Sequence, residues 1–269
     1  MDTLTPARTA LVTGASAGIG KAIAGVFAAH GFDLVLTARR ADRLQEVAQD
    51  LRAQHGCRVL VIAADLADPA APARLYQEVT AAAITVDALV NNAGYGVPGK
   101  LTDTTWEDQR DLVQVMVMAL AELTHRFLPG MIERRYGRII NVASVAGLVP
   151  PSAGHALYGS SKSLVIKFSQ SIALECLPYN VHVTALCPGF TYSEFHDVNG
   201  MRAQVSQLPA WMWMDAGTVA RQAYDAVMAG HVVYVTGGVN RAIVQLTRYL
   251  PQWLVMGVLR RVATRFRKV

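Results

Sequence analysis

Residues 9–20 read TALVTGASAGIG, an apolar run of strand length followed at once by a glycine-rich string and then by a helical pattern. Glycine lets the backbone turn tightly and approach a ligand closely, and a new helix offers unpaired N–H groups and the positive end of its dipole. Because the string lies between a strand and a helix, it predicts a site for the pyrophosphate of a dinucleotide rather than an ordinary turn. The residues expected to contact that group are Gly14, Ser16, Gly18, Ile19 and Gly20.

Short apolar runs and longer helical stretches continue to alternate along the chain. The first strands are expected at 9–12, 33–37, 58–63 and 86–90, the helices between them at 18–30, 41–55 and 69–83, and later strands at 138–142, 181–186 and 232–235. Strands joined by helices in this way lie parallel. The pattern therefore predicts an α/β fold, with a doubly wound parallel sheet of about seven strands between two helical layers, a three-layer αβα sandwich.

Length and composition restrict the class of protein. The chain has 269 residues, 52% hydrophobic and 17% charged, which suits one large core and excludes disordered and collagen-like chains. The three scattered cysteines form no CxxC pair, so we expect no disulfide framework and no metal site. The start of the chain lacks a secretory pattern, and no uninterrupted apolar run reaches the roughly 18 residues of a membrane span. We expect a cytoplasmic protein, soluble or attached to a membrane surface.

The net charge of +5 is unevenly distributed. Residues 226–269 hold seven Lys and Arg and no acidic residue, which leaves 18 basic against 20 acidic residues in the rest of the chain. The basic character therefore belongs to the C-terminal end, and since no base-reading motif is present, we expect no nucleic-acid partner. We divide the chain into a dinucleotide-binding and catalytic domain, residues 1–238, and a basic helical extension, residues 239–269.

The end of the second strand indicates which dinucleotide is preferred. A site for NAD usually has an acid there for the ribose hydroxyls, whereas this chain has Arg39 and Arg40, which suit a 2′-phosphate. We predict NADP(H), preferred over NAD(H); the alternative is that both arginines only begin a solvated helix. After the third strand, Asp65 and Leu66 are placed to contact adenine, although an aspartate before a helix is equally often a plain cap.

A second group of motifs follows the fourth and fifth strands. Asn91-Asn92-Ala93-Gly94 ends the fourth strand, Ser144 ends the fifth, and the next helix has Tyr158 and Lys162 on one face. Reduction of a carbonyl needs a proton donor, and an ammonium beside a phenol lowers the phenol's pKa from about 10. Tyr158 is predicted as the acid, Ser144 as the group that binds the carbonyl oxygen, and Lys162 as the residue that tunes the tyrosine.

Together these motifs resemble those of the short-chain dehydrogenase/reductase family, over about residues 9–195. The family's TGxxxGxG is similar to residues 13–20 and its NNAG to residues 91–94, and its catalytic Ser, Tyr and Lys resemble the three residues just named. Its Pro-Gly motif resembles Pro188-Gly189, with Ser193 in place of the usual Thr.

Several expectations follow from this resemblance. It implies a Rossmann-type sheet of strand order 3-2-1-4-5-6-7 and transfer of a hydride between NAD(P)H and a carbonyl or alcohol. It implies a homodimer or homotetramer, assembled through the helices around Met116 and Tyr158. The further cofactor-binding residues that it implies are Asn92, Ala93, Gly94, Tyr158, Lys162, Pro188, Gly189 and Ser193.

The chain departs from the family at Met116. The family has an Asn there, ahead of a Leu-Pro-Gly-Met turn like Leu128–Met131, and Met lacks the amide that stabilises the helix irregularity at this place. Gln114 faces elsewhere, about 200° round the helix. In the family this position helps to hold a water of the proton relay, partly through its main-chain carbonyl, which Met keeps. Two outcomes stay open: a working oxidoreductase, which we favour, and a catalytically weakened NADP(H)-binding sensor or scaffold.

Substrate selectivity is expected from the residues that flank these motifs. The stretch 190–214 has neither helical nor strand period, which predicts a lid over the site. With the residues after Gly94 it forms an apolar, adaptable wall that suits a hydrophobic ketone, aldehyde or alcohol. The alternative is that the tryptophans of this stretch only pack the lid down. The candidate substrate contacts are Tyr95, Tyr192, Phe195 and Trp211.

The C-terminal extension is expected to form two helices separated by Pro251. The first has a polar stripe at Arg241, Gln245, Arg248 and Gln252, and the second has an apolar face beside a basic one. A basic amphipathic helix either makes peripheral contact with an anionic membrane surface or packs on its own domain or a partner subunit. Both alternatives stay open at this point.

Overall fold

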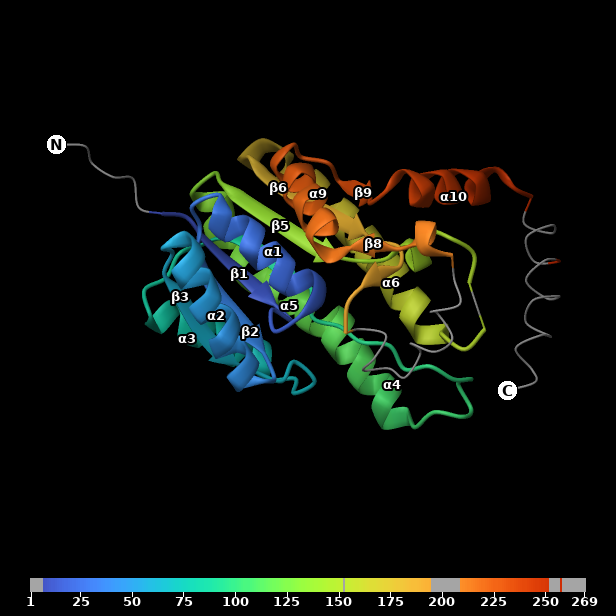
Figure 1. Cartoon of the computed structure of the whole chain (residues 1–269), viewed down its shortest axis with the longest axis horizontal. Helices are drawn as coiled ribbons and strands as arrows, with labels where there is room; N and C mark the ends of the chain where they lie inside the picture. Colours follow the sequence, from blue (N-terminus) through green and yellow to red (C-terminus); the bar gives the residue numbers. More distant parts are fainter. Residues whose placement is uncertain (1–6, 152, 195–208, 252–256, 258–269) are drawn as a thin grey trace.

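A seven-stranded parallel sheet forms the centre of the computed structural model, which describes residues 7–151, 153–194, 209–251 and 257 (Figure 1). The strand order is β3-β2-β1-β4-β5-β6-β9, so the predicted α/β fold and strand order are confirmed. The strands are β1 (Thr9–Thr13), β2 (Asp33–Ala38), β3 (Val59–Ala63), β4 (Val86–Asn91), β5 (Gly137–Val142), β6 (Val181–Cys187) and β9 (Val233–Val235).

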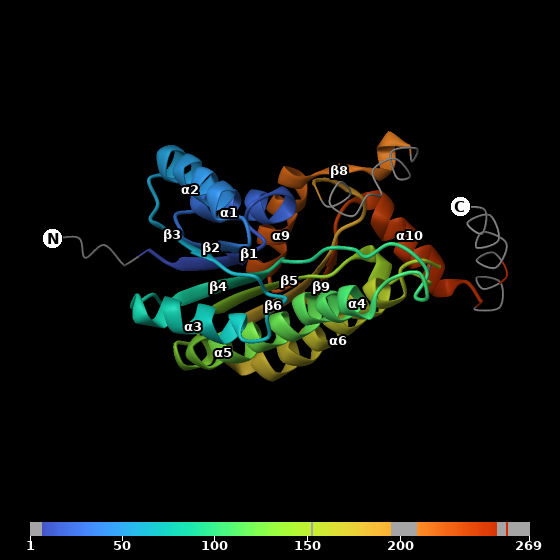
Figure 2. The same cartoon turned by 90° about the horizontal axis from the view of Figure 1, so that it is seen from below.

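Helices cover both faces of this sheet, as Figure 2 shows. One face carries α1 (Gly18–Ala29), α2 (Ala41–His55) and α9 (Ala216–Met228); the other carries α3 (Ala71–Ala81), α4 (Trp106–Val113), α5 (Ala119–Glu133) and α6 (Ala156–Cys176). Each layer has its own core, around Phe27 on the first face and around Leu123 and Met131 on the second. Apolar strands buried on both faces explain why these strands read as continuous apolar runs.

The carboxyl ends of the parallel strands lie at one edge of the sheet and bring the sequence motifs together. β1 leads into Gly14, β4 into Asn92, β5 into Ser144 and β6 into Pro188. Residues from widely separated parts of the chain therefore meet along this edge.

Helices α4 and α5 continue one another through a π-helical segment, Gln114–Met118. The prediction of a turn at Leu128–Met131 is wrong, because these residues lie inside α5. Pro129 removes only one helical hydrogen bond, and Phe127 and Met131 anchor the helix in the core on either side. Packing therefore overrides the local preference of proline.

Among the described residues, one helical stretch, Trp106–Glu133, is long and apolar enough on average to cross a membrane, although interspersed polar residues interrupt its apolar runs. Half of its most apolar window is buried inside the protein, and its α5 part packs against β4 and β5. The core helix of an α/β fold meets the same criteria, so this stretch is weak evidence for a membrane span.

The two ends of the stretch 190–214 have more regular structure than the sequence predicts. β7 (Thr191–Tyr192) and β8 (Met214–Asp215) form a small parallel sheet, and a 3-10 turn covers Ala210–Met212. Strands of two residues are too short to show a period of two, which explains why the pattern missed them. The predicted substrate contact Phe195 lies outside the described residues, as does the rest of 195–208.

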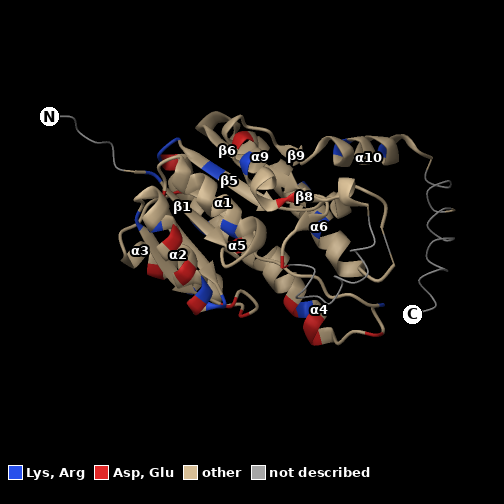
Figure 3. Ribbon diagram, in the orientation of Figure 1, with Lys and Arg blue, Asp and Glu red and all other residues tan. Residues whose placement is uncertain are grey.

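Helix α10 (Gly238–Tyr249) follows β9 and ends before Pro251, as that proline predicts. It lies beyond the end of the sheet (Figure 1), and Arg241 and Arg248 give it positive charge without an acidic residue (Figure 3). Leu246 and Tyr249 expose 64% and 78% of their surface. The second predicted helix lies outside the described residues, apart from Gly257.

Candidate active site

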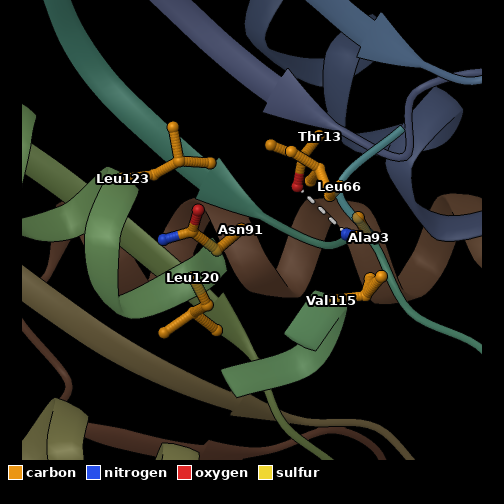
Figure 4. Close-up of a pocket in the computed structure, with 7 residues that line it drawn as sticks. All are labelled: Thr13, Leu66, Asn91, Ala93, Val115, Leu120 and Leu123. Atoms are coloured by element: carbon orange, nitrogen blue, oxygen red, sulfur yellow. Dashed lines mark hydrogen bonds between the residues drawn. The ribbon is translucent and has the colours of Figure 1, made fainter. Parts of the chain in front are cut away.

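Thr13, the last residue of β1, joins two of the sequence motifs. Its buried hydroxyl accepts hydrogen bonds from the backbone N–H groups of Asn92 (2.9 Å) and Ala93 (3.0 Å), the second of which is drawn in Figure 4. The side-chain amide of Asn92 donates to the backbone oxygens of Thr13 (2.9 Å) and Gly14 (3.2 Å). The glycine-rich loop and the Asn-Asn-Ala-Gly motif are thus held together as one unit.

The glycine-rich loop has the geometry that a pyrophosphate site requires. Gly14 and Gly18 have φ angles of +64° and +56°, and a Cβ on Gly20 would lie 2.4 Å from both Asn92 Nδ2 and the Gly14 carbonyl oxygen. No side chain caps the first turn of α1, so its N–H groups are available to an anion. The residues present therefore fit the diphosphate of a dinucleotide.

A small cavity lies beside this loop. Its volume is about 10 Å³, the size of one water site, and is too small for a nucleotide or a substrate. The lining residues, shown in Figure 4, are Thr13, Leu66, Asn91, Ala93, Val115, Leu120 and Leu123. Leu66 and Asn91 thus belong to the framework around the site. Asn91 donates to Thr124 Oγ1 (3.1 Å) and Asn141 Oδ1 (2.9 Å), which connects β4 to α5 and β5.

The arginines after β2 take part in an ion-pair cluster that the sequence did not reveal. Arg40 donates to Ser16 Oγ at 3.3 Å and pairs with one carboxylate oxygen of Glu194 at 3.0 Å. Arg43, one turn along α2, pairs with the other oxygen at 2.5 Å. The hydrogen bond from Arg40, and with it that from Arg43, holds the pKa of Glu194 below its usual range. Arg39 is exposed, and its charge acts to lower the pKa of Tyr95 against the larger effect of burial.

Asp65 has a local structural partner. Its Oδ1 accepts a hydrogen bond from the backbone N–H of Ala67 at 3.0 Å, six residues before α3 begins at Ala71. For this oxygen the structure shows a cap on the turn that follows β3. Only the other carboxylate oxygen of Asp65 is therefore available for the predicted contact with adenine.

Ser144 and Tyr158 lie side by side after β5. Ser144 Oγ accepts a hydrogen bond from the backbone N–H of Ala146 at 3.1 Å, and the Ser144 and Tyr158 side chains are hydrogen bonded to one another. Burial raises the pKa of Tyr158, while the hydrogen bond with Ser144 acts in the opposite direction. The phenol is therefore protonated at neutral pH and available as a proton donor.

Lys162 lies one turn beyond Tyr158 on α6 and is 6% exposed. Its Nζ donates to the backbone oxygen of Val142 at 2.7 Å and lies 5.8 Å from the centre of the Tyr158 ring. Burial lowers the pKa of Lys162 to about 8. At neutral pH the ammonium form predominates, so a positive charge lies close to the phenol ring.

The Pro188-Gly189 segment is supported from two sides. The backbone N–H of Val145 donates to the Pro188 oxygen at 2.9 Å, which ties this segment to the turn after β5 that bears Ser144. A Cβ on Gly189 would lie 2.4 Å from the amide atoms of Asn240, a buried residue in the first turn of α10. No sequence signal marks Asn240, because one polar residue in an amphipathic helix is expected to face solvent.

Comparisons with known proteins agree with this geometry. The short chain dehydrogenase family matches residues 8–202. Nodulation protein G of Rhizobium meliloti is 36% identical over 232 residues, which cover 86% of this chain and 93% of that protein. The chain belongs to the short-chain dehydrogenases.

A short-chain dehydrogenase from Sphingobium yanoikuyae in complex with NADPH is 31% identical, with a TM-score of 0.79 over 91% of this chain and 96% of that one. One from Burkholderia phymatum in complex with NAD is 26% identical, with a TM-score of 0.79 over 89% and 92%.

As a short-chain dehydrogenase, the protein is an oxidoreductase with a nicotinamide dinucleotide as its cofactor. Both the NADPH complex and the NAD complex share its fold at the same TM-score. The fold therefore leaves the preference between the two dinucleotides to individual side chains.

Met116 stands where the family resemblance predicts an Asn. It is buried and packs in one cluster with Tyr95 and Tyr158, and a Cβ on Gly94 would lie 3.3 Å from its Cγ. The π-helical segment that contains Met116 forms without a side-chain amide at position 116. Gln114 lines a surface hollow of about 340 Å³ that contains no predicted catalytic residue, and so faces elsewhere, as predicted.

Aromatic side chains gather at the described ends of the stretch 190–214. Tyr192 stacks on Trp213 with ring centres 4.8 Å apart, and Phe190 contacts the same indole at 5.5 Å. Tyr192 and Trp211 expose 52% and 63% of their surface. Trp213 therefore packs this region down, whereas the two predicted substrate contacts Tyr192 and Trp211 present open apolar surface.

Proposed function

We propose that the protein is an NADP(H)-dependent oxidoreductase that interconverts a hydrophobic ketone or aldehyde and its alcohol. The observation that supports this most directly is the hydrogen-bonded Ser144 and Tyr158 pair with the buried Lys162 ammonium one turn away. An acid of this kind, beside a hydride source, is what carbonyl reduction requires.

Each catalytic side chain has one task in this proposal. Bound NADPH would supply the hydride that adds to the carbonyl carbon. Tyr158 donates its hydroxyl proton to the carbonyl oxygen, which completes the alcohol and leaves a tyrosinate. Ser144 donates a hydrogen bond to the same oxygen and stabilises the negative charge that develops there. The Lys162 ammonium, close to the phenol ring, stabilises the tyrosinate until a proton returns.

The preference for NADP(H) rests on the arginines after β2. Arg40 already binds a carboxylate together with Arg43, next to Ser16 of the glycine-rich loop. Two guanidinium groups that converge on one anion are suited to a 2′-phosphate. Arg39 adds positive charge on the neighbouring position.

A hydrophobic substrate is favoured by the side chains near the catalytic tyrosine. Met116, Tyr95 and Val97 form one apolar cluster with Tyr158. Tyr192 and Trp211 present exposed aromatic surface at the described ends of the lid. Flexible methionine and aromatic walls accept apolar groups of varied shape better than a charged sugar.

The experiment is cofactor oxidation by the purified protein over a panel of aryl, cyclic and long-chain ketones, with hexoses as the polar comparison. We expect faster turnover with NADPH than with NADH, activity on the apolar ketones, and loss of turnover in Tyr158→Phe. Turnover that persists in Tyr158→Phe refutes the mechanism. If the wild type binds NADPH but does not turn over, the alternative of a sensor or scaffold is supported. A large gain of turnover in Met116→Asn would then show that Met116 causes the low activity.

We also propose a homo-oligomer assembled through α4, α5 and α6. Trp106, Met118 and Leu164 on or between these helices expose 67%, 55% and 47% of their surface. Such apolar exposure favours burial against a second copy. Light scattering should give a dimer or tetramer, and a smaller species for Leu164→Glu; a wild-type monomer contradicts this.

For the extension, we propose peripheral contact of the cytoplasmic enzyme with an anionic membrane. Leu246 and Tyr249 of α10 are exposed, so this helix leaves apolar surface free. A second copy of the extension would bring the same positive charge, whereas anionic lipid complements it. Vesicles with anionic lipid should pellet the full chain, and less of a full-length Leu246→Glu, Tyr249→Glu variant, which loses this apolar surface and keeps Asn240. Equal pelleting of both removes the membrane contact.

A further inference from the structure

Glu194 lies far from the glycine-rich loop in sequence but next to it in space. Its two carboxylate oxygens pair with Arg40 at 3.0 Å and with Arg43 at 2.5 Å. The same Nη2 atom of Arg40 also donates to Ser16 Oγ at 3.3 Å. The carboxylate thus occupies the position between α2 and the loop at which two cationic side chains converge.

The residue before Glu194 makes a second contact with the cofactor region. Ser193 Cβ lies 2.9 Å from where a Cβ on Gly18 would stand, so the backbone after β7 runs directly against the first residue of α1. Ser193 and Glu194 therefore lie along the glycine-rich loop, one at the helix start and the other at the arginines. Two independent contacts place this segment against the predicted cofactor site.

We propose that Glu194 is an internal competitor for the 2′-phosphate and thereby sets the affinity and specificity for NADP(H). This inference rests on the proposed function, in which Arg40 and Arg43 bind that phosphate. A phosphate monoester carries more charge and more acceptor oxygens than a carboxylate, so it displaces Glu194 from the two guanidinium groups. A nucleotide without a 2′-phosphate has no comparable group with which to displace it.

The exposure of the cluster determines how strong this competition is. The side chains of Arg40, Arg43 and Glu194 are each about 40% exposed, at 42%, 42% and 41%. Ion pairs of this exposure are weak, so the carboxylate weakens phosphate binding without preventing it. Removal of its charge should therefore tighten binding about three- to tenfold.

The test is calorimetric titration of the full-length protein with 2′,5′-ADP and with 5′-ADP, which need no catalytic turnover. In Glu194→Gln we expect 2′,5′-ADP to bind about three- to tenfold more tightly than in wild type, and 5′-ADP to bind within about twofold of wild type. Glu46→Gln is the matched control, because it removes the same charge from an exposed position on α2 and should change neither affinity. Adding Arg40→Ala to Glu194→Gln should abolish the gain.

The outcomes separate this inference from the proposed function. If the wild type discriminates between the two ligands and Glu194→Gln changes nothing, only the competition is refuted. If neither protein discriminates, both the competition and the preference for NADP(H) are refuted. If 5′-ADP binds more weakly to Glu194→Gln than to the wild type, the carboxylate of Glu194 is a ligand of the ribose. That result would overturn the inference. An equal gain in Glu46→Gln also overturns it, because the effect is then one of net charge.

Discussion

Replacing Thr13 by Val should damage the framework on which the cofactor site is built. The substitution keeps the shape of the side chain but removes the hydroxyl that accepts the N–H groups of Asn92 and Ala93 at 2.9 and 3.0 Å. It also removes the donor to the Val90 carbonyl at 3.2 Å. Thr13 is 1% exposed, so no solvent reaches the vacated position directly.

The expected cost follows from the two N–H groups left without an acceptor. A buried donor without a partner costs about 1 to 3 kcal/mol, and these two are partly buried, so the lower half of that range applies to each. We expect Thr13→Val to lower the free energy of unfolding by about 2 to 4 kcal/mol.

Thr37 provides a matched control in the neighbouring strand. It stands opposite Thr13 in the parallel register of β1 and β2, is also 1% exposed, and its hydroxyl has no hydrogen-bond partner among the described residues. Thr37→Val therefore removes a buried hydroxyl that makes no hydrogen bond with the described residues. The free energy of unfolding should stay unchanged or rise by up to about 1 kcal/mol.

Urea unfolding of both variants at one protein concentration, with unchanged m-values, measures this difference. The reasoning is refuted if Thr13→Val lies within about 0.5 kcal/mol of wild type, below the usual cost of a lost buried hydrogen bond. It is equally refuted if Thr37→Val costs as much as Thr13→Val, because burial alone would then explain both.

Two further predictions concern Lys162 and the glycine-rich loop. Burial lowers the pKa of Lys162 to about 8, so its ammonium group loses a proton as the pH rises through that value. We therefore expect kcat/KM for carbonyl reduction to fall there. A pH profile that stays flat well above this value contradicts the role of Lys162. Gly20→Ala should lower the melting temperature and abolish nucleotide binding, because its Cβ would lie 2.4 Å from Asn92 Nδ2. Gly25→Ala on the same helix, where a Cβ would meet only Leu51 at 3.8 Å, should be neutral or stabilising; equal effects of the two would refute the close approach.

Much of the fold follows from local patterns. Strands buried on both faces read as apolar runs, and the helices between them show their period, so all seven strands of the sheet were predictable to within about two residues. The turn expected at Leu128–Met131 fails because burial of Phe127 and Met131 outweighs one lost helical hydrogen bond at Pro129.

The candidate site shows where sequence patterns stop being informative. Ser144, Tyr158 and Lys162 lie together because the strand end and the helix spacing fix them. Glu194 and Asn240 make contacts between distant segments, which no local period records. Their positions depend on the path of the chain after β6 and β9, and that path is set by tertiary packing.

The most direct test of the central claim is the fate of a labelled hydride. The protein is incubated with NADPH carrying deuterium on the transferred position and with an apolar ketone that it accepts, and the alcohol is analysed by mass spectrometry. We predict one deuterium on the carbinol carbon in the wild type, and little labelled alcohol with Tyr158→Phe although NADPH still binds. Unlabelled alcohol from the wild type, or labelled alcohol formed at the wild-type rate by Tyr158→Phe, would contradict hydride transfer assisted by Tyr158.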